Sequence, residues 1–353
     1  MTACPRCGER SPGGTSWCEA CGADLSQPGS ASAADEPPQP GSQTTPDCPV
    51  CGSVGRTEDG ACDNCGRPDP DARNRVEAVD GPVAAVSDRG RRHPHNEDAF
   101  AVGTVDGVAV LVVCDGVSST PGSATASQGA ANAARDRLVA LLRGDAPPPD
   151  DDPVDPGARQ PGPAGVAGPA ADLDPVASIA DAVAVAQGVA ADTVASAEDI
   201  RTARYGFDGP PSSTLVAAVV DPTRAAPGTS ARITVGWVGD SRVYWVSDTD
   251  TMLLTVDHEI GGSLSRWLGA DSIDPLPDVA EIDVVGPGLV IACSDGLWRY
   301  ADGAHDMAQL VRNGTGAGEL DLARSMVDHA NAGGGHDNIT VALMPIPGPQ
   351  GAQ

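Results

Sequence analysis

Short apolar runs, many of them rich in Val, recur along the chain from about residue 76 to residue 347. They are five to eight residues long and are bounded by Gly, Asp or Pro, a pattern typical of β-strands separated by turns. These runs predict strands at 81–87, 98–103, 107–114, 213–220, 232–239, 242–247, 251–255, 279–285, 288–293 and 338–344.

Two longer stretches are rich in Ala, with Val, Leu and Ile spaced as on one face of a helix. They predict helices at 123–143 and 174–198, and further helices are predicted at 259–268 and 317–331. Many short strands with two long helices close together do not form a regular βαβ repeat. The pattern therefore indicates an α+β fold, in which helices pack outside stacked antiparallel sheets.

Composition divides the chain into an N-terminal region with eight cysteines and one large domain. The chain holds 43 Gly and 32 Pro, more than one compact domain requires, so part of it is expected to be linker. We predict two cysteine modules at 1–26 and 47–70, joined by a flexible linker at 27–46. The main domain is expected at 76–347, with a disordered insertion at 144–172 and a disordered tail at 348–353.

The net charge is strongly negative, because 49 Asp and Glu against 22 Lys and Arg give −27. Such a surface repels phosphate backbones and anionic lipids, so we expect no nucleic-acid and no membrane partner. The longest apolar run, 108–114, is far shorter than the ~20 residues that span a bilayer. Residues 1–10 also lack the apolar core of a signal peptide. These features predict a cytoplasmic protein.

The N-terminal cysteines form two modules, each with two Cys-x-x-Cys motifs separated by ten residues. The first module holds Cys4, Cys7, Cys18 and Cys21, and the second holds Cys48, Cys51, Cys62 and Cys65. Four thiolates at this spacing favour a tetrahedral zinc site, and each module is too small to fold without its metal. The duplicated pattern predicts two structural Zn²⁺ ions, and it resembles a double zinc ribbon. A redox Cys-x-x-Cys pair is the alternative, but no βαβ pattern surrounds it.

Sites closed by four cysteines leave no position for a substrate, so the ribbons are expected to mediate protein–protein contact rather than catalysis. The other two cysteines, Cys114 and Cys293, lie in apolar strands and are predicted to be buried. Disulfides are not expected in a reducing cytosol.

Five acidic motifs lie at the ends of predicted strands in the main domain. Their acidic residues are Asp88, Glu97, Asp98, Asp115, Asp240, Asp295 and Asp337. A single Asp-Gly after a strand is usually a turn. Several carboxylates that meet at strand ends would repel one another without cations, and their hard oxygen atoms suit Mg²⁺ or Mn²⁺.

The stretches that carry these residues are, in chain order, VSDRG…NEDAF, VVCDGVSS, PSSTLVAAVV, VGDSRVYWV, LTVDHE, LSRWLGA, CSDGLW and HDNITVAL. In order and spacing they resemble the metal-dependent PPM family of protein phosphatases, also called type 2C. The matched stretches run from about residue 80 to residue 344, nearly the whole main domain. The resemblance implies an α-β-β-α sandwich of two antiparallel sheets flanked by helices, with a two-metal cleft at one end.

The resemblance also implies a ligand set for two Mn²⁺ or Mg²⁺ ions. Asp115 would bridge both ions, and the carbonyl group of Gly116 would complete one of the two sites. Asp295 and Asp337 would hold the other ion.

Further residues are assigned by the same resemblance. Glu97 and Asp98 would bind metal-bound waters, and Asp240 would be either a ligand of a third, weakly held ion or a structural turn residue. Many relatives carry an Arg four residues before the acidic pair, and that Arg binds the substrate phosphate. His93 stands there in this chain, directly after Arg92, so His93 or Arg92 is expected to serve this role.

These residues predict a protein serine/threonine phosphatase that uses direct attack by a metal-activated water and opposes bacterial serine/threonine kinases. Its partners would be phosphorylated proteins, including such a kinase. One alternative is a pseudophosphatase that binds phosphoproteins as a regulatory scaffold. Another is a zinc-ribbon protein that binds nucleic acid, which the net charge and the few basic residues of the ribbons oppose. His258 and His336 are expected to be structural.

Overall fold

The computed structural model describes residues 2–3, 10–11, 74–118, 120–147, 174–195, 209–314 and 318–348. The predicted zinc ribbons at 1–26 and 47–70 and the linker at 27–46 lie outside these residues, apart from one short antiparallel pair. In that pair β1 (Thr2–Ala3) lies beside β2 (Arg10–Ser11). Most of the predicted insertion at 144–172 and nearly all of the tail at 348–353 also lie outside the described residues.

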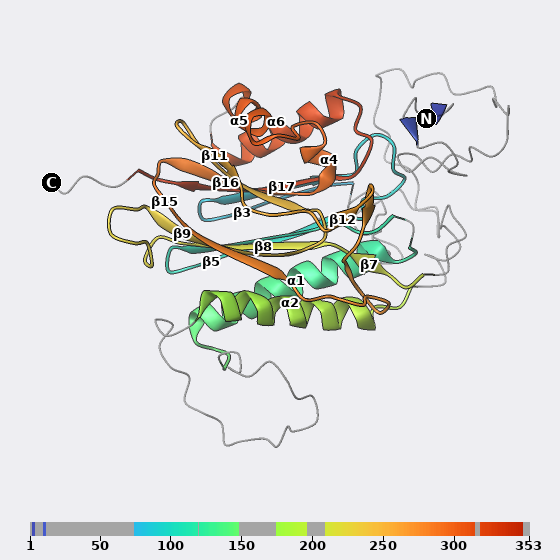
Figure 1. Cartoon of the computed structure of the whole chain (residues 1–353), viewed down its shortest axis with the longest axis horizontal. Coiled ribbons are helices and arrows are strands. Elements are labelled where there is room, and N and C mark those ends of the chain that lie inside the picture. The colour runs from blue at the N-terminus through green and yellow to red at the C-terminus, as the bar shows by residue number, and fades with distance from the viewer. Residues whose placement is uncertain are drawn as a thin grey trace, which may run out of the picture.

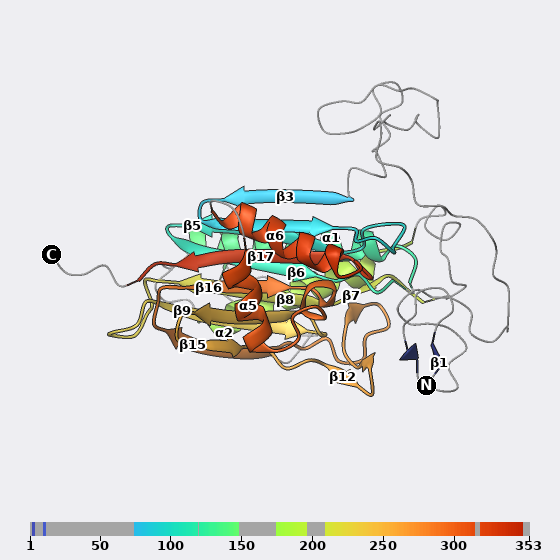
Figure 2. The same ribbon diagram turned by 90° about the horizontal axis from the view of Figure 1, so that it is seen from above.

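Two antiparallel sheets lie face to face, and helices cover both outer faces (Figure 1). The first sheet has the order β11-β10-β16-β17-β4-β3. Its strands are β3 (Arg75–Asp80), β4 (Val83–Asp88), β10 (Arg242–Ser247), β11 (Thr251–Leu253), β16 (Gly288–Cys293) and β17 (Ile339–Ile346). Figure 2 shows β3 at the edge of this sheet.

The second sheet has the order β15-β9-β8-β6-β5. Its strands are β5 (Ala99–Val105), β6 (Val108–Cys114), β8 (Leu215–Asp221), β9 (Ala231–Val238) and β15 (Asp278–Val284). Short pairs join β7 (Ser212–Ser213) to β14 (Leu268–Gly269) and β12 (Glu259–Ile260) to β13 (Ser263–Leu264).

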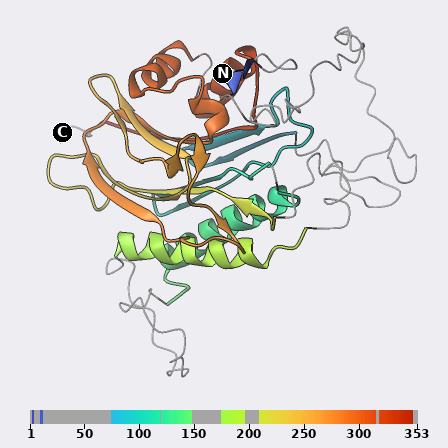
Figure 3. The same cartoon turned by 45° about the vertical axis from the view of Figure 1, so that its right-hand side comes forward.

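The helices form two separate layers. Helices α1 (Ser123–Arg143) and α2 (Pro175–Asp192) cover the second sheet. Helices α4 (Asp295–Trp298), α5 (Ala304–Asn313) and α6 (Glu319–Ala332) cover the first sheet. The layers stay on opposite sides of the sheets in the rotated view of Figure 3, so the predicted α-β-β-α sandwich is confirmed.

The sequence of strand β6 is apolar throughout because the strand is covered on both faces. Ala109, Leu111 and Val113 face the first sheet, while the alternate residues, among them Val110 and Val112, face α1 and α2. Both faces of β6 are therefore buried, because successive side chains of a strand point to opposite sides. The predicted burial of Cys114 and Cys293 is also confirmed, since neither is exposed to solvent.

The predicted helix at 259–268 is wrong. This segment forms the hairpin of β12 and β13 and then enters β14. Gly261 and Gly262 lie at its turn with φ of 64° and 89°, the left-handed values that a two-residue hairpin turn requires. The two glycines in this turn are incompatible with a continuous helix through the segment.

Other boundaries also differ from the prediction. The strand predicted at 81–87 begins at Val83, because Gly81 has a φ of 57° in the turn after β3. Helix α2 ends at Asp192 rather than at 198, since Thr193 is extended. Helix α5 was not predicted; its apolar face is narrow and consists mainly of Met307, Ala308 and Leu310.

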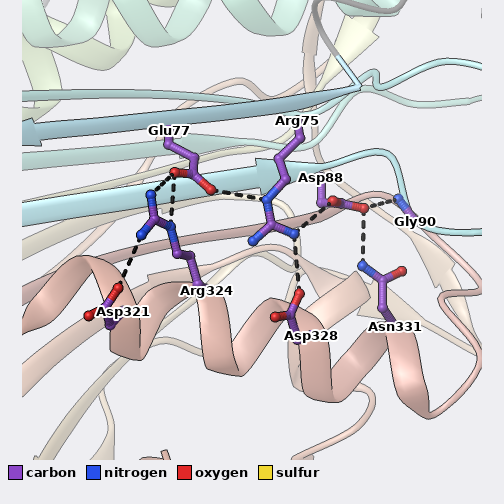
Figure 4. A network of polar contacts seen from close by, with 8 residues as sticks. All are labelled: Arg75, Glu77, Asp88, Gly90, Asp321, Arg324, Asp328 and Asn331. Atoms are coloured by element: carbon purple, nitrogen blue, oxygen red, sulfur yellow. Dashed lines mark hydrogen bonds and ion pairs between the residues drawn. The ribbon is translucent and has the colours of Figure 1, made fainter. Parts of the chain in front are cut away.

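A polar network joins the edge strand β3 to α6 (Figure 4). Arg75 pairs with Asp88 and Asp328, each at 3.2 Å, and Arg324 pairs with Glu77 at 2.6 Å. The network fixes the first described strand of the domain onto its helical layer. Within the described ranges, no helix has the length and apolar character needed to cross a membrane.

Candidate active site

Five aspartates meet at one end of the sandwich because of strand register. Asp98 directly precedes β5 and Asp115 directly follows β6, and these strands pair Ala99 with Cys114. In the other sheet Asp295 follows β16 and Asp337 precedes β17, and these strands pair Cys293 with Val341. Asp240 lies just beyond β9. Antiparallel neighbours thus place the end of one strand beside the start of the next.

Asp98 is a deeply buried carboxylate, with 3 % of its surface exposed. Its Oδ2 accepts a hydrogen bond from the hydroxyl group of Ser294 at 2.7 Å, while its Oδ1 is buried without a hydrogen-bond partner. Burial raises the pKa of Asp98 to about 7, and repulsion by Asp337 adds to the effect.

Asp115 and Asp295 are perturbed in the same way. Burial, and then repulsion by Asp98 and Asp295, raises the pKa of Asp115 well above its usual value. Burial and repulsion by Asp337 do the same to the pKa of Asp295, whose Oδ1 is also buried without a partner. Electrostatic repulsion of this kind acts between carboxylates that lie near one another.

Asp240 belongs to the same cluster. It is 7 % exposed, and burial raises its pKa to about 6 against the opposing attraction of Arg299. Its backbone carbonyl accepts a hydrogen bond from the indole of Trp298 at 2.9 Å. This contact fixes the loop after β9 against α4.

His93 reaches the cluster, whereas Arg92 does not. The Nε2 atom of His93 lies 3.2 Å from Oδ1 of Asp337, and its Nδ1 lies 3.5 Å from the hydroxyl group of Ser118. His93 also acts on Glu97, where its attraction opposes a pKa that burial raises. The side chain of Arg92 is exposed, and no ion pair joins it to any carboxylate in the described part of the chain.

Three polar residues of the site, Arg299, Ser294 and Asn338, were not predicted from the motifs. Arg299 follows α4, and its Nη2 lies 2.8 Å from Oδ2 of Asp295. The amide of Asn338 donates to the carbonyl groups of Arg89 and His95 at 2.7 and 3.0 Å. The Oδ1 atom of Asn338 accepts the backbone N–H of Glu97 at 2.8 Å, so Asn338 holds the His93 loop against β17. The positions of Ser294 directly before Asp295 and of Asn338 directly after Asp337 were the signals in the sequence.

Two glycines are required by close backbone approach. A Cβ atom on Gly116 would lie 2.5 Å from the carbonyl oxygen of Glu97, and one on Gly296 would lie 1.8 Å from that of Asn338. Real Cβ atoms do not come this close, so Asp-Gly at these two positions lets the strand ends converge.

His258 and His336 have the contacts of structural residues. Nδ1 of His258 accepts the backbone N–H of Gly239 at 3.0 Å, next to Asp240. Nδ1 of His336 lies 3.0 Å from the hydroxyl group of Tyr300.

Comparison with known proteins identifies the family to which the sequence belongs. The family model described as "Protein phosphatase 2C" matches residues 89–313, more than half of the chain. This chain belongs to the protein phosphatase 2C family. No curated protein matches the sequence at a significant level.

Solved structures share the fold of this phosphatase 2C domain at low sequence identity. The serine/threonine phosphatase Stp1 from Staphylococcus aureus matches with a TM-score of 0.54 and 16% identity, over 77% of this chain and 97% of Stp1. A bacterial serine phosphatase matches with 0.53 and 16%, over 76% and 98% of the two chains. A sex determining protein of C. elegans matches with 0.53 and 19%, over 78% and 67%.

The donor set of this phosphatase 2C domain fits hard divalent cations. Asp98 and Asp295 each have a buried carboxylate oxygen with no partner, and burial, followed by repulsion from neighbouring carboxylates, raises the pKa of both groups. Among the described residues, no three His, Cys, Asp or Glu side chains already surround a single point as metal ligands. Mg²⁺ usually keeps several waters and uses one or two carboxylates, so water and backbone oxygens can complete the coordination.

Proposed function

We propose that this chain is a metal-dependent protein serine/threonine phosphatase that hydrolyses phosphoserine and phosphothreonine by direct attack of a metal-activated water. The observation that carries the proposal is the convergence of five aspartates, two of which have buried oxygens without partners. A cluster of this kind is costly to ionise without cations. In the cell the enzyme would oppose a bacterial serine/threonine kinase, and we expect both to be cytoplasmic.

Each residue of the cluster would have a separate role in metal binding. Asp115 would contribute to both Mn²⁺ or Mg²⁺ sites, and the carbonyl group of Gly116 would complete one of them. Asp295 and Asp337 would hold the other ion. When bound, two such ions lower the pKa of a water and neutralise the phosphoryl oxygens. Ser294 would keep Asp98 in place through its 2.7 Å hydrogen bond.

The remaining residues of the site would act around this centre. Glu97 and Asp98 would orient waters by accepting their hydrogen bonds. Asp240 would ligate a third, weakly held ion. His93 would face the substrate from beside Asp337, and Arg92 would reach it only by moving from its exposed position. Exchange of His93 and of Arg92 for Gln, one at a time, tests both: unchanged affinity for substrate in both variants would contradict their role.

Turnover of p-nitrophenyl phosphate and of a phosphothreonine peptide with added Mn²⁺ tests the proposed function. Asp115→Asn should abolish activity, because it removes the carboxylate charge that the two proposed cation sites share. Asp106→Asn is the matched control: Asp106 lies in the turn between β5 and β6 with a φ of 50°, which Asn tolerates. Full turnover by Asp115→Asn with excess Mn²⁺ would contradict the assignment, and an inactive wild type would favour the phosphoprotein-binding scaffold.

The cysteine modules belong to the proposal as two structural zinc ribbons. Their support is the repeated spacing of four cysteines in each module. We expect two zinc ions per chain by elemental analysis, and one after Cys4 and Cys7 are both changed to Ser. Cys114→Ala is the control, because Cys114 is buried in β6 and should not affect zinc content. A zinc content below one ion per chain in the wild type would contradict the ribbons. We propose that they contact protein partners, such as the phosphorylated substrate.

A further inference from the structure

The position four residues before the acidic pair Glu97–Asp98 holds His93 rather than an arginine, and the two nearby arginines Arg92 and Arg242 do not reach the cluster in this structure. Arg92 is exposed on its loop. Arg242 is 8 % exposed, and its guanidinium already binds Asp257 at 2.7 Å, the hydroxyl group of Tyr244 at 3.1 Å and the carbonyl of Asp302 at 3.0 Å. His93 reaches the cluster, but an imidazole does not bind a phosphoryl group through two parallel hydrogen bonds.

Arg299 reaches the cluster from another element. Its Nη2 lies 2.8 Å from Oδ2 of Asp295, and its charge also acts on Asp337, Asp240 and Asp115. The side chain is nevertheless 58% exposed. A guanidinium has five N–H donors, so contact with one carboxylate oxygen leaves most of them directed to solvent at the edge of the cluster.

The backbone that carries Arg299 is fixed. Its N–H donates to the carbonyl group of Asp295 at 3.0 Å. The preceding residue, Trp298, is 8 % exposed, binds the carbonyl of Asp240 through its indole, and stacks against Arg242 with 3.6 Å from the guanidinium carbon to the ring centre. The backbone at Arg299 is therefore held in place, and its guanidinium lies beside Asp295 and 5.6 Å from the centre of the Trp298 ring, which suits a residue that meets a ligand at a defined place.

We infer that Arg299 binds the phosphoryl group of the substrate, alongside His93, through the planar set of donors that an imidazole lacks. The inference rests on the proposed phosphatase function and assigns one residue within it. The Arg299 end of this ion pair is exposed while Asp295 is buried, so the guanidinium offsets part of the buried charge and still presents other donors at the surface. The planar guanidinium of Arg299 can donate two parallel hydrogen bonds to two oxygens of a phosphate. The neighbouring carboxylates would at the same time hold the cations.

Binding of inorganic phosphate to the full chain, measured by calorimetry in excess Mg²⁺, tests this inference without requiring turnover. Arg299→Gln should weaken phosphate binding about tenfold or more, the loss expected for a charge-assisted hydrogen bond, and should raise KM for a phosphothreonine peptide by a similar factor. Arg299→Lys should give an intermediate loss, because an ammonium keeps the charge without the fork. Arg324→Gln is the matched control: Arg324 is 43% exposed and pairs with Glu77 in the network that joins α6 to β3 (Figure 4).

Mg²⁺ titration of the same variants separates a phosphate contact from an effect on the cation site. Weaker phosphate binding by Arg299→Gln with undiminished Mg²⁺ affinity supports the inference. Equal phosphate affinity in wild type and Arg299→Gln would overturn it, as would a loss explained by weaker Mg²⁺ binding. If Arg299→Gln does not fold, the phosphate affinity of Arg299→Lys tests the inference instead, because a lysine there can keep the ion pair with Asp295. A wild type that binds phosphate but shows no turnover would overturn the proposed function and leave the role of Arg299 in phosphate binding testable by the same comparison.

Discussion

Asp98→Asn should stabilise the protein in the absence of divalent cations at neutral pH. The carboxylate is 3 % exposed, has one oxygen without a partner, and has its pKa raised to about 7. An amide of the same shape carries no charge to desolvate. Its oxygen can still accept the hydrogen bond from Ser294.

The magnitude follows from proton linkage. A shift of the Asp98 pKa from 3.8 to about 7 corresponds to about 4 kcal/mol. Between these two pKa values the folded state binds more protons than the unfolded state, so the free energy of unfolding falls as pH rises. Through Asp98 alone, the wild type should lose about 2 to 3 kcal/mol between pH 5 and pH 7.5.

Urea unfolding without added divalent cations, followed by tryptophan fluorescence at pH 5 and pH 7.5, measures this slope. Trp237, Trp245 and Trp298 are buried in the domain and report its unfolding. Asp98→Asn should have the flatter dependence on pH. Added Mn²⁺ should stabilise the wild type more at pH 7.5 than at pH 5, since ions bind ionised carboxylates. Equal slopes for wild type and Asp98→Asn would refute the reasoning.

Two further predictions concern positioning. Ser294→Ala should lower the free energy of unfolding by about 1 to 3 kcal/mol at pH 7.5, because Asp98 loses its hydrogen-bond donor; an unchanged urea midpoint would contradict this. Gly296→Ala should cost more than about 3 kcal/mol and remove activity, because its Cβ would lie 1.8 Å from the carbonyl oxygen of Asn338. Gly188→Ala in α2 is the control: its Cβ would meet nothing within 4 Å, and it should raise Tm slightly.

Local patterns predicted much of the fold. Helix α1 has the predicted bounds of 123–143, and strands β6 and β16 differ from prediction by one residue at most. Strand β6 has an unbroken apolar signal because it is buried on two faces, and α1 has a regular stripe of Ala and Leu that packs against the second sheet while its other face is polar. Prediction failed at 259–268, where Gly261 and Gly262 form a hairpin turn, and at α5, whose buried face is narrow.

The active-site residues divide in the same way. The sequence indicated Asp115, Asp295 and Asp337, because each lies at the end of an apolar strand within a recognisable motif. It held no sign that Ser294 would donate to Asp98, since 196 residues separate them.

By itself, then, the sequence determined most strands of the two sheets, the two long helices and the aspartates at strand ends, since these depend on neighbours a few residues away. The edge strand β3 was not predicted. Tertiary structure alone decided which charges meet. Pairing of β16 with β17, and of β5 with β6, brings the strand ends together. The short helix α4 then directs Arg299 back toward Asp295, one turn earlier in the chain. Burial and mutual repulsion arise only after that assembly, and they are what raise the pKa of Asp98 and make the cluster suited to bind cations.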